Sequence, residues 1–454
     1  MTAVSDASPW VRRSDAVVVA LVVAIGLVHA ARGVGLLLDD YTSLANARLS
    51  GMWSAAGAPR GMQRPVDVLV FGSMFGLLGE HMLWHLAALT IVRAATAVLL
   101  LHLLRLAFAP QVALLGVVLW LLQPNHVSTE LWSTASILDV ALLGCLVALS
   151  LLRRAPTPGR DIAVCILLLL SALCYEAIIP LGLAGLLLVP WLVRRRIEWR
   201  VVVAGGTTMA LAAAWSLTHL EGFKAAAHGF ADLSPAVGAQ LGFGVAPAGP
   251  AALATLLAGL LGIALVLFGS ARRWVRHDVA TLVLGGLAVV ALGVIPFAHY
   301  SFEPRGGGDR VDFVASIGGA MVWTGLVVGL WAVRRALGVA LLVVIVALAS
   351  VRRWQVGTAW SNAFEDSATI RAALRAVPIE PGETLVVGPM IPVCENITAF
   401  RDDQGVTEAL HVARGSDVGA GHVAASPEEF AAAPEPRLDL RNLQLHCSVQ
   451  EAGA

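Results

Sequence analysis

The chain has 454 residues, of which 57% are hydrophobic and only 14% charged, and its mean hydropathy is +0.77. These values exclude an ordinary water-soluble globular protein. The formal net charge is zero and no segment interleaves basic with aromatic residues, so nothing favours nucleic acid as a partner. The composition predicts a helical protein that crosses the membrane several times.

The hydrophobic residues of the first 350 positions fall into eleven apolar runs. The runs cover residues 15–38, 83–104, 107–123, 134–152, 162–175, 177–193, 201–218, 250–269, 279–297, 314–333 and 336–350. A helix needs about 20 such residues to cross the hydrocarbon core of a bilayer. The sequence therefore predicts an all-α transmembrane domain over residues 1–350, with about 11 transmembrane helices.

Arginine is concentrated in every second connection. These segments contain Arg12, Arg13, Arg105, Arg153, Arg154, Arg160, Arg194, Arg195, Arg196, Arg200, Arg272, Arg273, Arg276, Arg334 and Arg335. Short loops rich in Lys and Arg stay in the cytoplasm. The pattern predicts an integral protein of the plasma (inner) membrane with a cytoplasmic N-terminus and an extracytoplasmic C-terminal part.

Some apolar stretches need a separate interpretation. Residues 162–193 are tight for two crossings, and arginines at both ends favour a hairpin of short helices with Glu176 at its outer tip. Residues 66–78 are too short to span and predict an interfacial helix within the first outer loop, residues 39–82. A signal peptide is the alternative for the first run, because residues 28–30 loosely fit a cleavage site.

Residues 351–454 have the Pro, Gly, Asp and Glu content of a globular domain. Ser361–Val377 predicts an amphipathic helix and Thr384–Gly388 a short strand, whereas residues 419–436 are expected to form a loop. Together they predict a small extracytoplasmic α/β domain. Two cysteines of this domain pair if it faces an oxidising compartment, namely Cys394 and Cys447.

The connections on the predicted outer side collect carboxylates and histidines. The first opens with Asp39-Asp40, and acids at a membrane edge indicate a reaction site or a permeation mouth. In the second, His126 and Glu130 stand at i and i+4, on one face of any helix that follows. Further candidates on this side are Arg64, His85, Glu176 and Arg310.

Sugar transfer from a lipid phosphate requires such residues. A carboxylate takes the proton of the attacking hydroxyl, and positive charge from arginine or a divalent metal stabilises the departing phosphate. A lipid-linked donor enters from the bilayer, so the site must lie at the membrane surface. A secondary transporter stays open as an alternative, although it would place its charges near mid-membrane on broken helices of two related halves.

The chain resembles the GT-C superfamily of polyprenyl-phosphate-sugar-dependent glycosyltransferases, in particular the branch with the protein O-mannosyltransferases. Five motifs in order over residues 15–330 carry this resemblance: Leu38-Asp39-Asp40-Tyr41; Arg64-Pro65 with Trp84-His85; Pro124, His126 and Glu130; Ser171 to Glu176 with Pro180; and Asp309-Arg310 to Ser316. Tyr175 replaces a family lysine, and Val311 and Phe313 replace two tyrosines. The lost lysine weakens the argument for phosphate binding.

The resemblance implies a GT-C-like helical bundle and an inverting glycosyltransferase. Asp39 or Asp40 would be the catalytic base, and Arg310 and Arg64 would bind the donor phosphate. The residues implied on the acceptor side, or in support of it, are His126, Glu130, Glu176 and His85. A divalent metal, if required, would have Asp40, His126 and Glu130 as candidate ligands. The implied partners are the lipid-linked donor, membrane lipids and an acceptor that is a protein, a lipid or a polysaccharide.

Each motif also has a structural interpretation. As structural features, the acid pair of the first outer loop would cap the helix end and stop the first run, and His126 and Glu130 would form one solvated helix face. Arg310 would then be an interfacial side chain that reaches into water. Arg93, in the middle of the second run, is expected to pair inside the protein. A non-catalytic relative that binds lipid-linked sugars is the third functional hypothesis.

Overall fold

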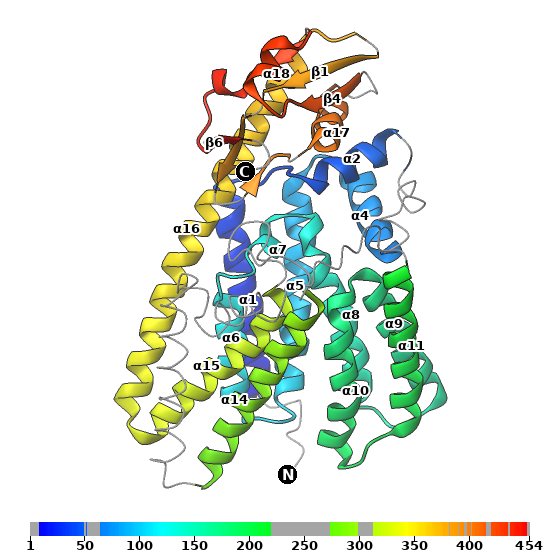
Figure 1. Cartoon of the computed structure of the whole chain (residues 1–454). Helices are drawn as coiled ribbons and strands as arrows, with labels where there is room; N and C mark the ends of the chain where they lie inside the picture. Colours follow the sequence, from blue (N-terminus) through cyan, green and yellow to red (C-terminus); the bar gives the residue numbers. More distant parts are fainter. Residues whose placement is uncertain are drawn as a thin grey trace.

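The computed structural model describes residues 9–49, 51, 64–218, 273–297, 312–380, 382–388, 390–394, 397–400, 402–414, 419–434 and 436–451. The predicted run at 250–269 and Arg310 lie outside these residues. The described part is a long helical bundle that has a small domain with two short sheets at one end (Figure 1).

Helices make up almost all of the bundle. Its helices are α1 (Pro9–Arg32), α2 (Asp39–Leu49), α4 (Pro65–Leu78), α5 (Met82–Leu104), α6 (Pro110–Leu122), α7 (Ser128–Leu131), α8 (Ile137–Leu151), α9 (Pro158–Cys174), α10 (Ile179–Arg194), α11 (Trp199–Thr218), α14 (Arg273–Val294), α15 (Phe313–Val333) and α16 (Arg335–Ala376). Short 3₁₀ turns, η2 (Thr134–Ser136), η3 (Glu176–Ile178) and η4 (Ile295–Phe297), adjoin α8, α10 and α14.

Seven helices in the described residues are long and apolar enough to cross a membrane. They cover Pro9–Arg32, Met82–Leu104, Thr134–Leu151, Glu176–Arg194, His277–Phe297, Phe313–Val333 and Arg335–Ala376. Two other predicted runs contain shorter helices, α6 with 13 residues and α9 with 17. The predicted hairpin at 162–193 is confirmed as α9 and α10, and the predicted short helix at 66–78 as α4. The interfacial position of α4 stays a prediction.

Close backbone contact determines how α14 and α15 pack. A Cβ atom added at Gly318 of α15 would lie 2.3 Å from the carbonyl oxygen of Gly286 in α14. Small residues at such positions let two helices approach closely, which is how helices pack where no water drives them together. The apolar residues of α15 are therefore buried along nearly its whole length.

Helix α16 runs without interruption through 42 residues, from the bundle into the C-terminal domain. It contains both the last predicted run and the amphipathic helix predicted at Ser361–Val377, so residue 350 lies inside a helix. Its first half has exposed apolar side chains such as Val343 and Leu348, whereas Trp360 and Phe364 in its second half are buried. One helix thus has an exposed apolar surface, of the kind that faces lipid, in its first half and a face buried in a protein core in its second half.

The C-terminal domain contains two three-stranded sheets. Strand β1 (Glu383–Val387) pairs in parallel with β4 (Gly419–Val423) and β5 (Arg437–Leu438), while β2 (Met390–Cys394) pairs antiparallel with β3 (Ile397–Thr398) and β6 (Ser448–Glu451). Helix α17 (Asp403–Arg414) packs on β4, and α18 (Pro427–Ala432) and η6 (Leu440–Asn442) complete the domain. The predicted strand at 384–388 is confirmed as β1, and the predicted pairing of Cys394 with Cys447 as a disulfide.

The loop predicted at 419–436 is wrong, because this segment contains β4 and α18. Its Ala, Pro and Glu content suggested a loop, but β4 packs closely on α17: a Cβ at Gly421 would lie 2.4 Å from Val406 of α17. Helix α18 has a sequence signal that the prediction overlooked. Ser426 accepts a hydrogen bond from the backbone N–H of Glu429, as a Ser-x-x-Glu start predicts.

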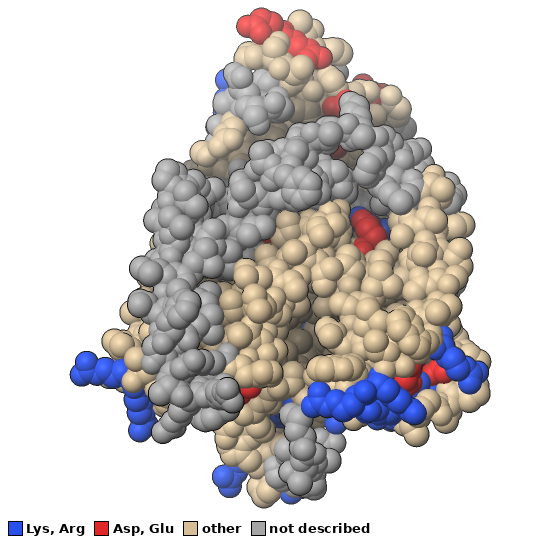
Figure 2. All heavy atoms as spheres, turned by 60° about the horizontal axis from the view of Figure 1, so that its bottom comes forward, with Lys and Arg blue, Asp and Glu red and all other residues tan. Residues whose placement is uncertain are grey.

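The charged residues are sorted along the bundle. Figure 2 shows arginines gathered at the end that lies away from the C-terminal domain, with a broad surface that carries few charged residues between the two ends. The N-terminus lies at that arginine-rich end in Figure 1. This arrangement agrees with a membrane-embedded protein; the side on which each end lies stays a prediction.

Candidate functional site

The acid pair lies in a sharp turn between α1 and α2. Leu38 adopts a φ of +45°, which side chains other than glycine rarely do, and Asp39 begins α2 directly after it. One oxygen of Asp40 accepts a hydrogen bond of 3.3 Å from the backbone N–H of Leu37, and the other accepts one of 3.0 Å from Thr134. Asp40 therefore holds the turn against the connection between α7 and α8.

The two acids differ in their surroundings. Asp40 is completely buried, and burial raises its pKa to about 8 although the two backbone N–H groups oppose the shift. Asp39 is half-buried. Burial raises the pKa of Glu408 in α17, and the negative charge of Asp39 adds to this shift. Of the pair, Asp39 is the accessible carboxylate.

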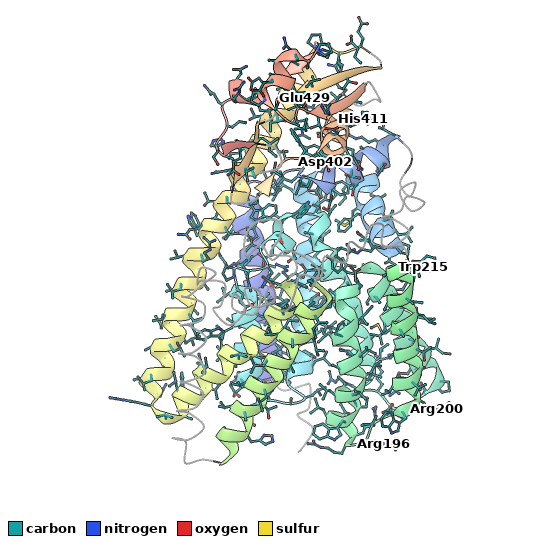
Figure 3. All side chains as sticks on the ribbon, in the orientation of Figure 1. Arg196, Arg200, Trp215, Asp402, His411 and Glu429 are labelled. Atoms are coloured by element: carbon teal, nitrogen blue, oxygen red, sulfur yellow. A yellow bond between two sulfur atoms is a disulfide. The ribbon has the colours of Figure 1, made fainter. Side chains whose placement is uncertain are left out.

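The C-terminal domain covers this turn, so that the predicted first outer loop is in contact with it (Figure 1). The backbone N–H of Leu38 donates to the carbonyl of Ala399 at 2.9 Å, and the hydroxyl groups of Tyr41 and Ser367 lie 2.5 Å apart. Thr42 also donates to Glu408. In Figure 3, the labelled residues Asp402 and His411 lie in this domain, next to α2.

Glu130 is the centre of a buried ionic cluster. Its carboxylate lies 2.9 Å from His29 Nε2 and 3.8 Å from His126 Nε2, and it forms ion pairs with Arg93 and Arg353. The predicted proximity of His126 and Glu130 is confirmed, but the alternative of a solvated face is wrong, because their side chains are only 1% and 3% exposed. Burial and then the two arginines lower the pKa of His126, so the ring is neutral.

Arg93 pairs inside the protein, as predicted, and its partners are now defined. It binds Asp139 of α8 through Nε at 3.2 Å and Nη2 at 2.6 Å, in addition to Glu130. His29, Asp139 and Arg353 were not among the predicted site residues. His29 and Asp139 were detectable as isolated polar residues within apolar runs, whereas Arg353 was counted as part of the domain beyond the membrane.

Two residues predicted separately form one pair. Arg64 donates from Nε to Glu176 at 2.9 Å and makes a second, parallel bond to the same carboxylate. Its guanidinium also lies 4.0 Å from the ring centroid of Tyr175, the residue that replaces the family lysine. Arg64 is thus engaged by Glu176, which leaves its predicted role with the donor phosphate without a direct structural basis.

His85 is fully buried and has a local structural partner. Its Nε2 lies 3.1 Å from the carbonyl of Gly79, and its ring lies against Phe75 with centroids 4.6 Å apart. These contacts connect the end of α4 with the start of α5. His85 therefore supports the junction of α4 and α5. It is not a partner in the hydrogen bonds that hold the Asp39–Asp40 turn.

The predicted metal ligands do not converge in the described part of the chain. Asp40, His126 and Glu130 form no group whose ligand atoms all lie close together. Glu130 is neutralised by two arginines, and the oxygens of Asp40 accept backbone N–H groups. A divalent metal therefore stays a prediction from the resemblance. The residues whose possible ligand atoms do lie close together are Asp366, Cys394 and Cys447. Their two sulfur atoms are close because they form the disulfide.

A cavity of about 450 Å³ lies near the chain that leads into the acid pair, but neither Asp39 nor Asp40 lines it. The chain between α1 and α2 forms one wall, including Leu36, which is next to the Leu37 that binds Asp40. The connection between α4 and α5 forms another wall, with Glu80, and α16 contributes Arg371. The sequence analysis assigned no role to Glu80 or Arg371.

Two apolar side chains at the rim of this cavity are exposed. Leu83 and Trp84, in the first turn of the candidate span α5, are 59% and 66% exposed. Tryptophan is enriched where a membrane meets water. The cavity therefore combines an apolar rim with a charged interior.

Comparison of the chain with protein-family models, curated proteins and solved structures gives no match.

Proposed function

We propose that the chain is an integral membrane glycosyltransferase that moves a sugar from polyprenyl phosphate to an acceptor hydroxyl at the outer face. The observation that carries the proposal is the position of Asp39-Asp40. The pair is fixed in the turn between α1 and α2, three residues after Leu36, which lines a cavity of about 450 Å³ together with the exposed apolar side chains of Leu83 and Trp84. A lipid-anchored donor can reach such a cavity from the bilayer.

The geometry supports a division of roles between the two acids. Asp39 is the accessible carboxylate and is the proposed base. Asp40 is a positioning residue, because its buried carboxyl group holds the turn through Leu37 and Thr134. Leu38, directly before the acid pair, has a strained left-handed backbone conformation. Such strain persists where the surrounding structure fixes it, and it is concentrated at functional sites.

The proposed step is a single displacement. The acceptor oxygen attacks the anomeric carbon, the bond from that carbon to the phosphate oxygen breaks, and the electron pair leaves with the polyprenyl phosphate. The hydroxyl proton passes to the Asp39 carboxylate. Attack from the side opposite the leaving group inverts the anomeric configuration. Positive charge near the phosphate is needed to stabilise the leaving group.

The test is sugar transfer in membranes that contain the full chain, with a panel of radiolabelled polyprenyl-phosphate sugars. Wild type is compared with Asp39→Asn and with Glu428→Gln, an exposed acid of α18 that serves as the control. Label that reaches an acceptor with wild type and the control, and falls at least about a hundredfold with Asp39→Asn, supports the proposal. Transfer that survives Asp39→Asn refutes the assigned base, and no transfer from any donor favours the non-catalytic hypothesis.

One observation favours a second candidate, a proton-coupled secondary transporter. Arg93 lies near the middle of α5, and its cluster with Glu130 and Asp139 is buried inside the bundle. Ionisable residues at such depth mark ion or proton pathways in many membrane proteins. Proton flux into dye-loaded proteoliposomes, abolished by Glu130→Gln, would favour this candidate. Sugar transfer without any flux would exclude it.

A further inference from the structure

A single carboxylate, that of Glu80, holds three arginines from two separate elements. Arg48, at the end of α2, binds one oxygen at 2.5 Å. Arg371 of α16 binds the other oxygen, and Arg375, one turn further along α16, lies 4.0 Å from it. The cluster therefore joins the first outer loop to the helix that carries the C-terminal domain.

This cluster has an excess of positive charge. Three guanidinium groups share one carboxylate, which leaves two positive charges unbalanced among these four side chains. Arg371 uses only Nη1 for a side-chain bond among the described residues, so that its Nε and Nη2 have donor capacity left. The side chains of Arg371 and Glu80 are 22% and 27% exposed, so the excess charge is partly shielded from water and less screened than at an open surface.

Of the three arginines, Arg371 lines the cavity described above, whereas Arg48 and Arg375 are held at the same carboxylate without lining it. Arg371 and Glu80 both line it, together with His81 and the backbone of Gly33 and Gly35. The rim of the cavity is apolar instead of charged, because the exposed side chains there are Leu83 and Trp84. A ligand that fits both parts has an anionic group attached to an apolar chain. A phosphate suits the anionic part, because arginine donates two parallel hydrogen bonds to phosphate oxygens.

We propose that this cavity binds the phosphate group of a membrane lipid, with Arg371 as the main ligand and Arg48 and Arg375 in support. The proposal deepens the proposed function, since a polyprenyl phosphate is its donor, and it assigns the phosphate to residues other than Arg64 and Arg310. Glu80 holds the arginines in place and competes with the incoming phosphate for them. Binding is measured without transfer, so the two proposals fail separately.

The alternative is that the cluster only holds α2 against α16. The two interpretations differ in the effect of Glu80→Gln. If the cluster is purely structural, this substitution removes the shared partner and leaves lipid binding unchanged or weaker. If the cluster binds phosphate, the substitution removes a competing negative charge, and the affinity for phosphate rises although the fold loses three ion pairs.

The experiment uses the purified full chain in nanodiscs of phosphatidylcholine and native mass spectrometry to count retained lipids. The three probes are polyprenyl monophosphate, phosphatidylglycerol and inorganic phosphate in solution. Wild type is compared with Arg371→Gln, Glu80→Gln and Arg441→Gln. Arg441 is the matched control, because it is also an arginine of the C-terminal domain paired with one carboxylate, Asp439, at 2.6 Å.

We expect Arg371→Gln to weaken polyprenyl phosphate binding about tenfold or more, Glu80→Gln to strengthen it, and Arg441→Gln to leave it unchanged. Tighter retention of polyprenyl phosphate than of phosphatidylglycerol identifies the donor-type lipid, and the reverse order identifies a phospholipid headgroup. Binding of inorganic phosphate alone, without either lipid, overturns the lipid part of the proposal. Equal losses in Arg371→Gln and Arg441→Gln, or unchanged or weaker binding in Glu80→Gln, overturn the site.

Discussion

Asp40 and Thr134 are joined by a 3.0 Å hydrogen bond from the backbone N–H of Thr134 to the Asp40 carboxyl group, across 94 residues of sequence. The bond connects the turn after α1 with the segment that leads into α8. Asp40 was expected to face a substrate, but its carboxyl group accepts hydrogen bonds inside the protein. The neighbouring Asp39 is the more accessible of the two acids. This relationship separates two residues that the sequence motif presents as equivalent.

The raised pKa of Asp40 predicts how stability depends on pH. An acid with a higher pKa in the folded than in the unfolded protein binds its proton more tightly when folded, so its contribution to the free energy of unfolding falls as the pH rises from about 4 to about 8. We expect wild type to lose thermal stability relative to Asp40→Asn over this range. Tm values of both proteins at several pH values check it, and parallel curves would contradict the buried carboxyl group.

The cluster around Glu130 predicts a large loss of stability when one member is removed. Glu130→Gln leaves Arg93 and Arg353 buried without their shared carboxylate, which costs about 3–5 kcal/mol. The control is Glu365→Gln in α16, whose side chain is 59% exposed and whose loss costs at most about 1 kcal/mol. Thermal unfolding in detergent measures both. Similar Tm values for the two variants would show that Glu130 is not held by the arginines.

The apolar pattern predicted most of the bundle, because a run of apolar residues and the helix that it forms are local properties. The uninterrupted α16 could not be predicted in this way. Arg352 and Arg353 read as the end of a membrane segment, yet Arg353 turns into the protein and binds Glu130. That partner is 223 residues away in the sequence, so no local pattern contains it.

In the candidate site, too, relationships between neighbouring residues could be predicted, whereas contacts between distant residues could not. The acid pair and the proximity of His126 to Glu130 follow from short spacings and could be predicted. The partners that decide what each residue can do are distant: His29 lies 101 residues from Glu130, and Arg64 lies 112 residues from Glu176. Arg64 was therefore expected beside a phosphate, and only the tertiary contact shows that a carboxylate engages it.

The pair of Arg64 and Glu176 predicts a measurable coupling between the first outer loop and the α9–α10 hairpin. Arg64→Lys keeps the charge but loses the two parallel hydrogen bonds, so we expect it to destabilise nearly as much as Arg64→Gln. A double-mutant cycle with Glu176→Gln should give a coupling energy of about 1–3 kcal/mol. The free energies of unfolding of the two single variants and the double variant supply it; additive losses would mean that the pair contributes no coupling.

The disulfide between Cys394 and Cys447 predicts both the stability and the compartment of the C-terminal domain. The bond joins the last residue of β2 to Cys447, directly before β6 and 53 residues away in the sequence, and the loss of such a link costs about 2–5 kcal/mol. Replacing both cysteines by serine should therefore speed proteolysis of residues beyond α16, while α1 to α11 stay protected by the surrounding bundle or membrane.

The same bond reports on topology, because disulfides persist in oxidising compartments and are rare in the cytosol. In intact cells a membrane-permeant maleimide should leave Cys394 and Cys447 unmodified until a reductant is added. Cys165, which is free and partly exposed, is the internal control for reagent access. Labelling of Cys394 and Cys447 without reductant would place the domain on the reducing side, and with it the arginine-rich end of the bundle outside.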